Sequence, residues 1–195
     1  MHPELTTDAL VHLVHRFYPA GLDNEDPRYN ESEEGQRLNE VILANVKPSQ
    51  SWKDFIQRLR GEFPGCSLWD TTIPRHDPCY GVRVSQPGFV PGDPRCDDVV
   101  CLLSQIAPVY ALYASHVQER GPGLPRDAWL RFPPFPPDFQ EREARLASLI
   151  ESTFGFTRLS SEVLFTPVPD LVPRSANYSL GQAQLIDLLF TRHRW

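Results

Sequence analysis

The chain has 195 residues, and residues 1–195 are most simply read as a single domain with one hydrophobic core. Its hydrophobic content of 41% and aromatic content of 11% are ordinary for a globular protein, whereas its 20 prolines are about twice the average usage of roughly 5%. The formal net charge of −6 argues against a general binder of nucleic acid or of an anionic membrane surface.

The first ten residues, MHPELTTDAL, lack the basic and then apolar pattern of a secretory signal. A cytoplasmic location is therefore the default expectation, and the four cysteines are expected to be reduced thiols. The cysteines lie 13, 17 and 5 positions apart, which differs from the short paired spacing of structural zinc sites. We expect no metal and no cofactor.

Three amphipathic helices are predicted before any clear strand, over residues 7–18, 33–46 and 51–63. The third has the most regular spacing of large apolar side chains, which are Trp52, Phe55, Ile56, Leu59 and Phe63. Proline or glycine follows each predicted helix and ends it. Helices that precede the strands favour a segregated α+β fold over an alternating βαβ design.

Strands are predicted over residues 67–73 and 80–86. In YGVRVSQ, the sequence of the second strand, apolar residues alternate with others, so one side of that strand is expected to face solvent. A proline-rich loop over residues 86–98 then leads to a further strand. A long antiparallel hairpin is the simplest arrangement of these two strands.

Residues 99–117 form the longest run without a formally charged side chain, if His116 is counted as neutral. The run approaches the roughly 20 residues of a membrane-spanning helix, but its polar residues and its lack of flanking basic clusters argue against a span. Pro108 removes a backbone donor and pushes the preceding residue out of the helical region. The run is therefore predicted to be the core of the fold, as a strand, a bend and a second strand.

Residues 119–138 include six prolines. One interpretation is a polyproline ligand for an aromatic groove. The other is a loop that Trp129, Phe132 and Phe135 pin onto the domain, and these large apolar groups favour it.

After this loop we predict a helix over residues 137–154 that ends at Gly155, a short strand over 162–166, and a last helix that begins near Ser179. The predicted fold is thus a small, mainly antiparallel sheet packed by about five helices.

Most of the net negative charge lies in residues 23–34, DNEDPRYNESEE, where six carboxylates accompany one arginine. The carboxylates are Asp23, Glu25, Asp26, Glu31, Glu33 and Glu34. They can form a solvated loop that leads into a helix, whose first turn favours negative charge. Alternatively, they can form an acidic face that binds a basic partner protein.

No phosphate-binding, zinc-protease or nucleophile-elbow signature occurs in the chain. Reactive side chains gather only in PRHDPCY, where His76, Asp77 and Cys79 lie close together in sequence. Groups in a catalytic site usually meet through the fold instead, so a simple turn is an adequate alternative. His116, at the end of the central strands, is interpreted as a hydrogen-bonded histidine of the core or its rim.

In general character the chain resembles the immunity proteins that bacteria carry against their own polymorphic toxins. The features that resemble them are the DNEDPRYNESEE segment, the helices before a small sheet and the lack of a catalytic signature. The resemblance implies a cytoplasmic protein that binds a basic toxin through its acidic face and blocks the toxin's active site.

Two other functions remain open at this stage. The first is a small hydrolase-like enzyme with a site near His76 and Cys79, with His116 as a further candidate. The second is an accessory subunit of a larger assembly, which an exposed apolar patch around residues 132–139 would indicate.

Overall fold

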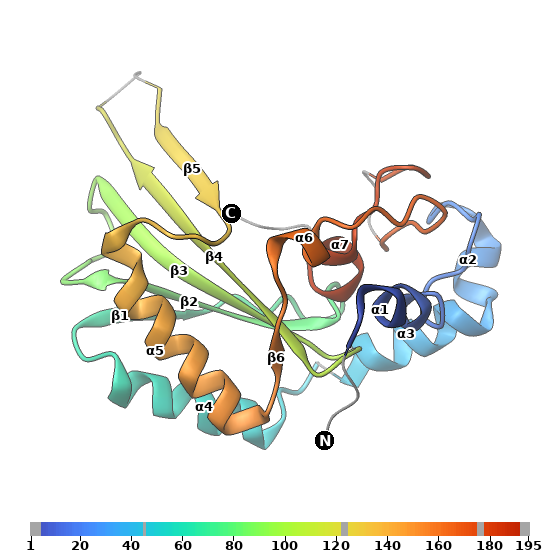
Figure 1. Ribbon diagram of the computed structural model, residues 1–195, viewed down its shortest axis with the longest axis horizontal. Coiled ribbons are helices and arrows are strands. Elements are labelled where there is room, and N and C mark those ends of the chain that lie inside the picture. The colour runs from blue at the N-terminus through green and yellow to red at the C-terminus, as the bar shows by residue number, and fades with distance from the viewer. Residues whose placement is uncertain (1–4, 45, 122–124, 175–177, 192–195) are drawn as a thin grey trace.

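The computed structural model describes residues 5–44, 46–121, 125–174 and 178–191 (Figure 1). Its centre is an antiparallel sheet in which the strands follow one another in chain order. These strands are β1 (Cys66–Asp70), β2 (Cys79–Pro87), β3 (Arg95–Ser104), β4 (Val109–Gln118) and β5 (Asp127–Arg131). A two-residue strand, β6 (Thr157–Arg158), pairs in parallel with β4.

The described residues form seven helices. They are α1 (Thr7–Val14), α2 (Pro27–Glu31), α3 (Glu33–Ala44), α4 (Gln50–Glu62), α5 (Pro137–Phe154), α6 (Ser161–Leu164) and α7 (Leu185–Leu189). The predicted α+β fold with a mainly antiparallel sheet is therefore confirmed. None of the described helices has both the length and the apolar character that crossing a membrane requires.

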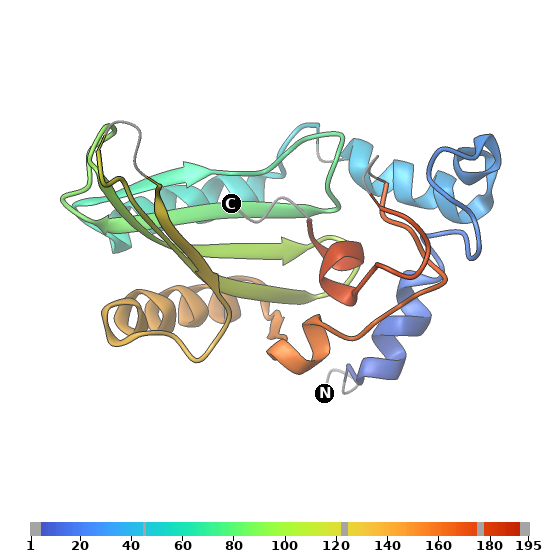
Figure 2. The ribbon, with the colours of Figure 1, turned by 90° about the horizontal axis from the view of Figure 1, so that it is seen from above.

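Different helices cover the two faces of the sheet (Figure 1). The long helices α4 and α5 lie on one face, where they pack with Val99, Cys101 and Leu103 of β3. The helices α1, α3, α6 and α7 pack against the other face, with Val100 and Leu102 of the same strand. Figure 2 shows that α1, α2, α3 and α7 gather at one end of the sheet.

The uncharged run forms β3 and β4, as predicted, with the bend at Pro108 between them. Both strands are buried on both faces, which is why their side chains do not alternate between apolar and polar. The antiparallel hairpin of β2 and β3 is also confirmed.

Several predicted boundaries were wrong. The first helix ends at Val14 instead of residue 18, and α3 is described only to Ala44. The first predicted strand, over residues 67–73, is shorter and spans Cys66–Asp70. Asn45, within the predicted range 33–46, lies outside the described residues.

The predicted strand over residues 162–166 was also wrong, because the helix α6 covers its first three residues. Ser160 precedes α6 and caps it, since its hydroxyl accepts a hydrogen bond from the backbone N–H of Val163. The predicted last helix is shorter than expected and begins at Leu185.

Two further expectations about the sheet were wrong. The proline-rich segment contains β5, whose residues 127–131 pair with β4. The side of β2 that was expected to face solvent is largely covered, because Gly81 and Ser85 are buried. At Gly81 the cause is local: the chain after β1 folds back, and a Cβ atom there would lie 2.6 Å from Oγ1 of Thr71.

Candidate functional site

The six predicted carboxylates lie on one corner of the molecule, formed by α2, the residues before it and the start of α3 (Figure 1). We call this corner the acidic surface. Its members are Asp23, Glu25, Asp26, Glu31, Glu33 and Glu34. The segment is not the simple loop that one interpretation expected, because Pro27–Glu31 is helical.

Two of the six carboxylates have local cationic partners. Asp26 caps α2 and pairs with Arg28 at 2.6 Å, and the hydrogen bonds from Arg28 hold the pKa of Asp26 at about 2. Glu33 pairs with Arg37 at 2.9 Å, one turn further along α3. Neighbouring arginines therefore offset part of the negative charge of these two acids.

The other four carboxylates, those of Asp23, Glu25, Glu31 and Glu34, form no ion pair with any described residue. Asp23 accepts a hydrogen bond from the backbone N–H of Glu25, at 3.3 Å. Glu25 and Glu31 are exposed to solvent. The acidic surface thus retains negative charge that the described part of the chain does not neutralise.

The backbone that carries the acidic surface is anchored to the core by α2 and its junction with α3. Tyr29 of α2 is only 1% exposed, and its hydroxyl donates to the carbonyl oxygen of Val172 at 2.7 Å. The hydroxyl of Ser32 donates to the carbonyl of Tyr29 and accepts from the N–H of Gly35. A Cβ atom at Gly35 would lie 2.1 Å from the Tyr29 oxygen, so only glycine allows this close approach of α2 and α3.

His76, Asp77 and Cys79 have different surroundings at the turn before β2. Cys79 is 3% exposed, and burial raises the pKa of its thiol well above the usual value, which opposes a thiolate nucleophile. Asp77 is buried, whereas His76 is exposed to solvent. All four cysteines are free, and no three potential metal ligands gather anywhere among the described residues.

His116 is a satisfied rim histidine, as the sequence indicated. Its Nδ1 lies 2.5 Å from Oδ1 of Asp97, and Arg95 pairs with the second oxygen of Asp97 at 2.5 Å. Burial alone would raise the pKa of Asp97, but the hydrogen bonds from His116 and Arg95 outweigh it and lower the pKa. Arg142 of α5 donates to the backbone carbonyl of Asp97 at 2.7 Å. This network links β3, β4 and α5.

A patch that would indicate an accessory subunit is not found around residues 132–139. Phe135 and Phe139 are 6% and 3% exposed, and both pack in the core between the sheet, α4 and α5. Phe132 is partly buried and packs against the opposite cluster. The proline-rich segment is thus pinned to the domain by its aromatic residues, as one of the two interpretations predicted.

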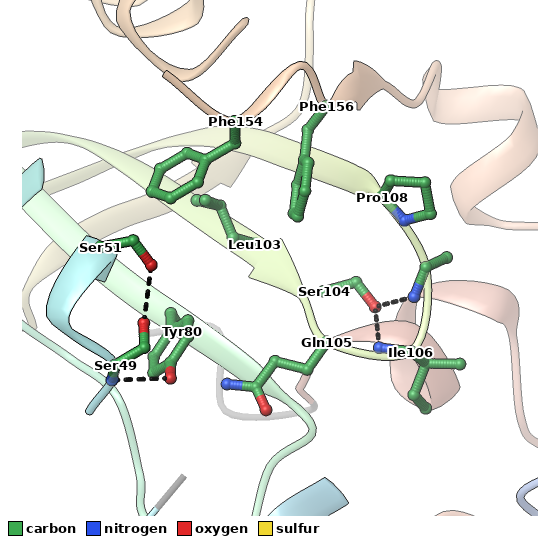
Figure 3. A pocket seen from close by; sticks show the side chains of 11 residues that line it. Ser49, Ser51, Tyr80, Leu103, Ser104, Gln105, Ile106, Pro108, Phe154 and Phe156 are labelled. Atoms are coloured by element: carbon green, nitrogen blue, oxygen red, sulfur yellow. Dashed lines mark hydrogen bonds between the residues drawn. The ribbon is translucent and has the colours of Figure 1, made fainter. Parts of the chain in front are cut away.

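A pocket of about 320 Å3 lies at the N-terminal end of α4, between this end of the helix and the β3–β4 turn (Figure 3). Ser49 and Ser51 come from the α4 N-terminus and Tyr80 from the start of β2. Phe154 and Phe156 stand on the facing wall, where α5 leads into β6. Leu103, Ser104, Gln105, Ile106, Ala107 and Pro108 complete the lining.

Tyr80 is positioned from two sides. Its ring stacks on Trp52 of α4, with ring centres 4.8 Å apart and an interplanar angle of 10°. Its hydroxyl accepts a hydrogen bond from the backbone N–H of Ser49 at 3.2 Å. The hydroxyls of Ser49 and Ser51 lie 3.0 Å apart and share one hydrogen bond. The polar side of the pocket is therefore held by α4 and β2 together.

Sequence reasoning missed this pocket because its walls come from four segments that are distant along the chain. The available signals were limited to the Ser49 cap and the bend at Pro108, and neither indicates a cavity. Asp97 was missed as well, although a carboxylate at the start of an apolar strand signals a buried ion pair.

The chain matches no known protein family, no curated protein and no solved structure.

Proposed function

We propose that this protein is a protein-binding module of the immunity type, which binds a basic partner such as a cognate toxin and blocks the partner's active site. The observation that supports the proposal is the presence of unneutralised carboxylates on a surface whose helix α2 is anchored to the core. Four of its six carboxylates have no cationic partner among the described residues, although Asp26 and Glu33 do.

Like charges that are gathered on a surface repel one another, and without cationic partners they contribute little to the stability of the fold. The same charges attract a basic partner over a distance and raise the association rate. Tyr29 and Gly35 fix α2 against α3 and the core, so little conformational entropy is lost when a partner binds. A rigid acidic corner therefore suits recognition better than it suits stability.

A toxin produced in the same bacterium would meet this protein in the cytoplasm, so the proposal includes a cytoplasmic location. The protein acts by steric and electrostatic occlusion and needs no cofactor. Nucleic acid and membrane surfaces are not expected partners, because both are anionic and the chain carries a net charge of −6.

The experiment is affinity capture from native lysate at low and moderate salt, with three forms of the tagged protein. The test variant is Glu25→Lys with Glu31→Lys. The matched control is Glu141→Lys with Glu162→Lys, which reverses two exposed carboxylates on α5 and α6 and changes the net charge equally.

We expect the wild type and the control to retain the same basic protein at low salt and to release it as salt rises. The test variant should lose that protein at both salt concentrations. Equal retention by the test variant and the control would reject the acidic surface as the binding site. Failure of the wild type to retain any protein from toxin-expressing cells would reject the binding function.

A further inference from the structure

The pocket between the α4 N-terminus and the β3–β4 turn has a chemical character that the proposed partner binding does not explain (Figure 3). It is lined by none of the six carboxylates of the acidic surface. None of the described residues that line it is charged. Recognition there depends on hydrogen bonds and apolar contact.

The polar side of the pocket contains hydroxyl donors that have no acceptor among the described residues. The Tyr80 hydroxyl accepts from the Ser49 N–H, and its own proton has no acceptor among the described residues. Ser49 and Ser51 have two hydroxyl protons between them and one shared hydrogen bond, so one proton remains available. Nε2 of Gln105 is buried without a hydrogen-bond partner. An incoming acceptor group would satisfy the free hydroxyl protons of Tyr80 and of the Ser49–Ser51 pair.

The electrostatic setting also favours an acceptor that carries negative charge. The pocket includes the first residues of α4, a helix of 13 residues whose first turn contains no carboxylate. The partial positive charge of the helix N-terminus is therefore not offset within that turn. In Figure 3 the amide of Gln105 extends towards the side of the pocket where Ser49 and Tyr80 lie.

The opposite wall is apolar and aromatic. Phe154 and Phe156 stand beside Leu103 and Pro108, and the two phenylalanine rings lie 5.6 Å apart. Such a wall favours a flat ring, which gains both burial and ring contacts. The volume of about 320 Å3 is at the lower end of the roughly 300–1,000 Å3 range of ligand pockets. The ligand is therefore expected to be small.

We propose that this pocket binds a small aryl carboxylic acid. The carboxylate accepts hydrogen bonds from the Tyr80 and Ser51 hydroxyls at the α4 N-terminus, and the aromatic ring packs against Phe154 and Phe156.

The test uses 3-phenylpropionate as the probe and the full-length protein, with binding followed by amide chemical shifts and by calorimetry. Two compounds with the same ring and chain length but other head groups, 3-phenylpropanol and 3-phenylpropylamine, are titrated in parallel. We expect the carboxylate to shift the amide signals of Ser51, Tyr80 and Gln105 and to bind at least tenfold more tightly than the amine. Equal binding of the three compounds, or no shift at these residues, would overturn the proposal.

Two substitutions test the donors. Tyr80→Phe retains the ring that stacks on Trp52 but removes the hydroxyl, and Ser51→Ala alters an exposed residue. Each should weaken the binding of 3-phenylpropionate about tenfold, as expected for a lost hydrogen bond to a charged group. Ser148→Ala, an exposed serine on α5, is the control and should bind as the wild type does. Wild-type affinity in Ser51→Ala, which is not expected to affect folding, would reject the site even if Tyr80→Phe were unstable.

The result of the 3-phenylpropionate titration is independent of the result of the partner-capture experiment. Glu25→Lys with Glu31→Lys lies outside the pocket and should leave probe binding unchanged.

Discussion

Two groups of carboxylates in this protein have opposite surroundings. Asp97 and Asp98, at the start of β3, are 4% and 2% exposed, and each has a cationic partner. Glu25 and Glu31 on the acidic surface are exposed and have no such partner among the described residues. A buried carboxylate must be paired to be tolerated, whereas an exposed one can remain available. The first group therefore holds the fold together, and the second is free to serve recognition.

The largest effect is expected at Asp97. The substitution Asp97→Asn removes the charge that faces His116 and Arg95, and it should lower the free energy of unfolding by about 3 kcal/mol. Chemical denaturation measures this loss. The control is Asp127→Asn on β5, which disrupts an exposed ion pair with Arg120 and should cost about 1 kcal/mol or less. If both variants lost the same free energy of unfolding, burial would not determine how much a paired carboxylate contributes to stability.

The contribution of Asp97 to stability should also depend on pH. Because the pKa of Asp97 is lower in the folded state than the unfolded value of about 3.9, its stabilisation is present above that value. The stabilisation is lost as pH falls through the lower, folded-state pKa. The difference in unfolding free energy between the wild type and Asp97→Asn should therefore be full at neutral pH and shrink below about pH 4. A difference that grows on acidification would contradict this assignment.

The second effect concerns the rigidity of the acidic surface. Gly35→Ala places a Cβ atom against the Tyr29 carbonyl and should destabilise the protein by about 1–3 kcal/mol, despite the better helix propensity of alanine. Gly61→Ala in α4 is the control, since a Cβ there meets no atom within 4 Å and should stabilise by up to about 1 kcal/mol. Thermal unfolding of the two variants should shift in opposite directions. A stabilising shift in Gly35→Ala would show that α2 and α3 can move apart to accommodate the added Cβ atom.

Tyr29→Phe should have a smaller effect on stability, about 1 kcal/mol, because it removes the hydrogen bond to Val172 and keeps the buried ring. Tyr18→Phe loses an equivalent bond to Leu188 on another part of the same core. Both variants should unfold at similar denaturant concentrations. Only Tyr29→Phe is expected to weaken capture of the proposed basic partner. Equal capture by both variants would show that the proposed binding does not depend on the position of α2.

The smallest effect on stability is expected from neutralising the acidic surface. Glu25→Gln with Glu31→Gln should change the free energy of unfolding by less than about 1 kcal/mol, since neither carboxylate has an ion pair to lose. Partner association should nevertheless slow, most clearly at low salt. Stopped-flow mixing measures the rate and denaturation measures the stability. A marked loss of stability would mean that these carboxylates are structural, like Asp97.

Much of the fold could be predicted from the sequence where neighbouring residues decide the structure. The spacing of Trp52, Phe55 and Leu59 indicated α4, and all three side chains are buried. The short elements β5 and α6 were missed, because a strand of five residues gains its stability from its partner strand and a one-turn helix from its cap and its packing. The acidic segment was located correctly, but its rigidity depends on Val172, which is 143 positions from Tyr29.

The sequence by itself determined the central hairpin. An apolar run with a proline near its middle has few alternatives, because Pro108 restricts the backbone locally and the flanking side chains must be buried. Only the tertiary structure decided which polar groups are paired and which are available. Pairing of β4 with β3 and β5 places His116 beside Asp97 and Trp129, and packing of α4 on the sheet brings Ser49 to Tyr80. Such contacts join residues that are remote in sequence, so no local pattern encodes them.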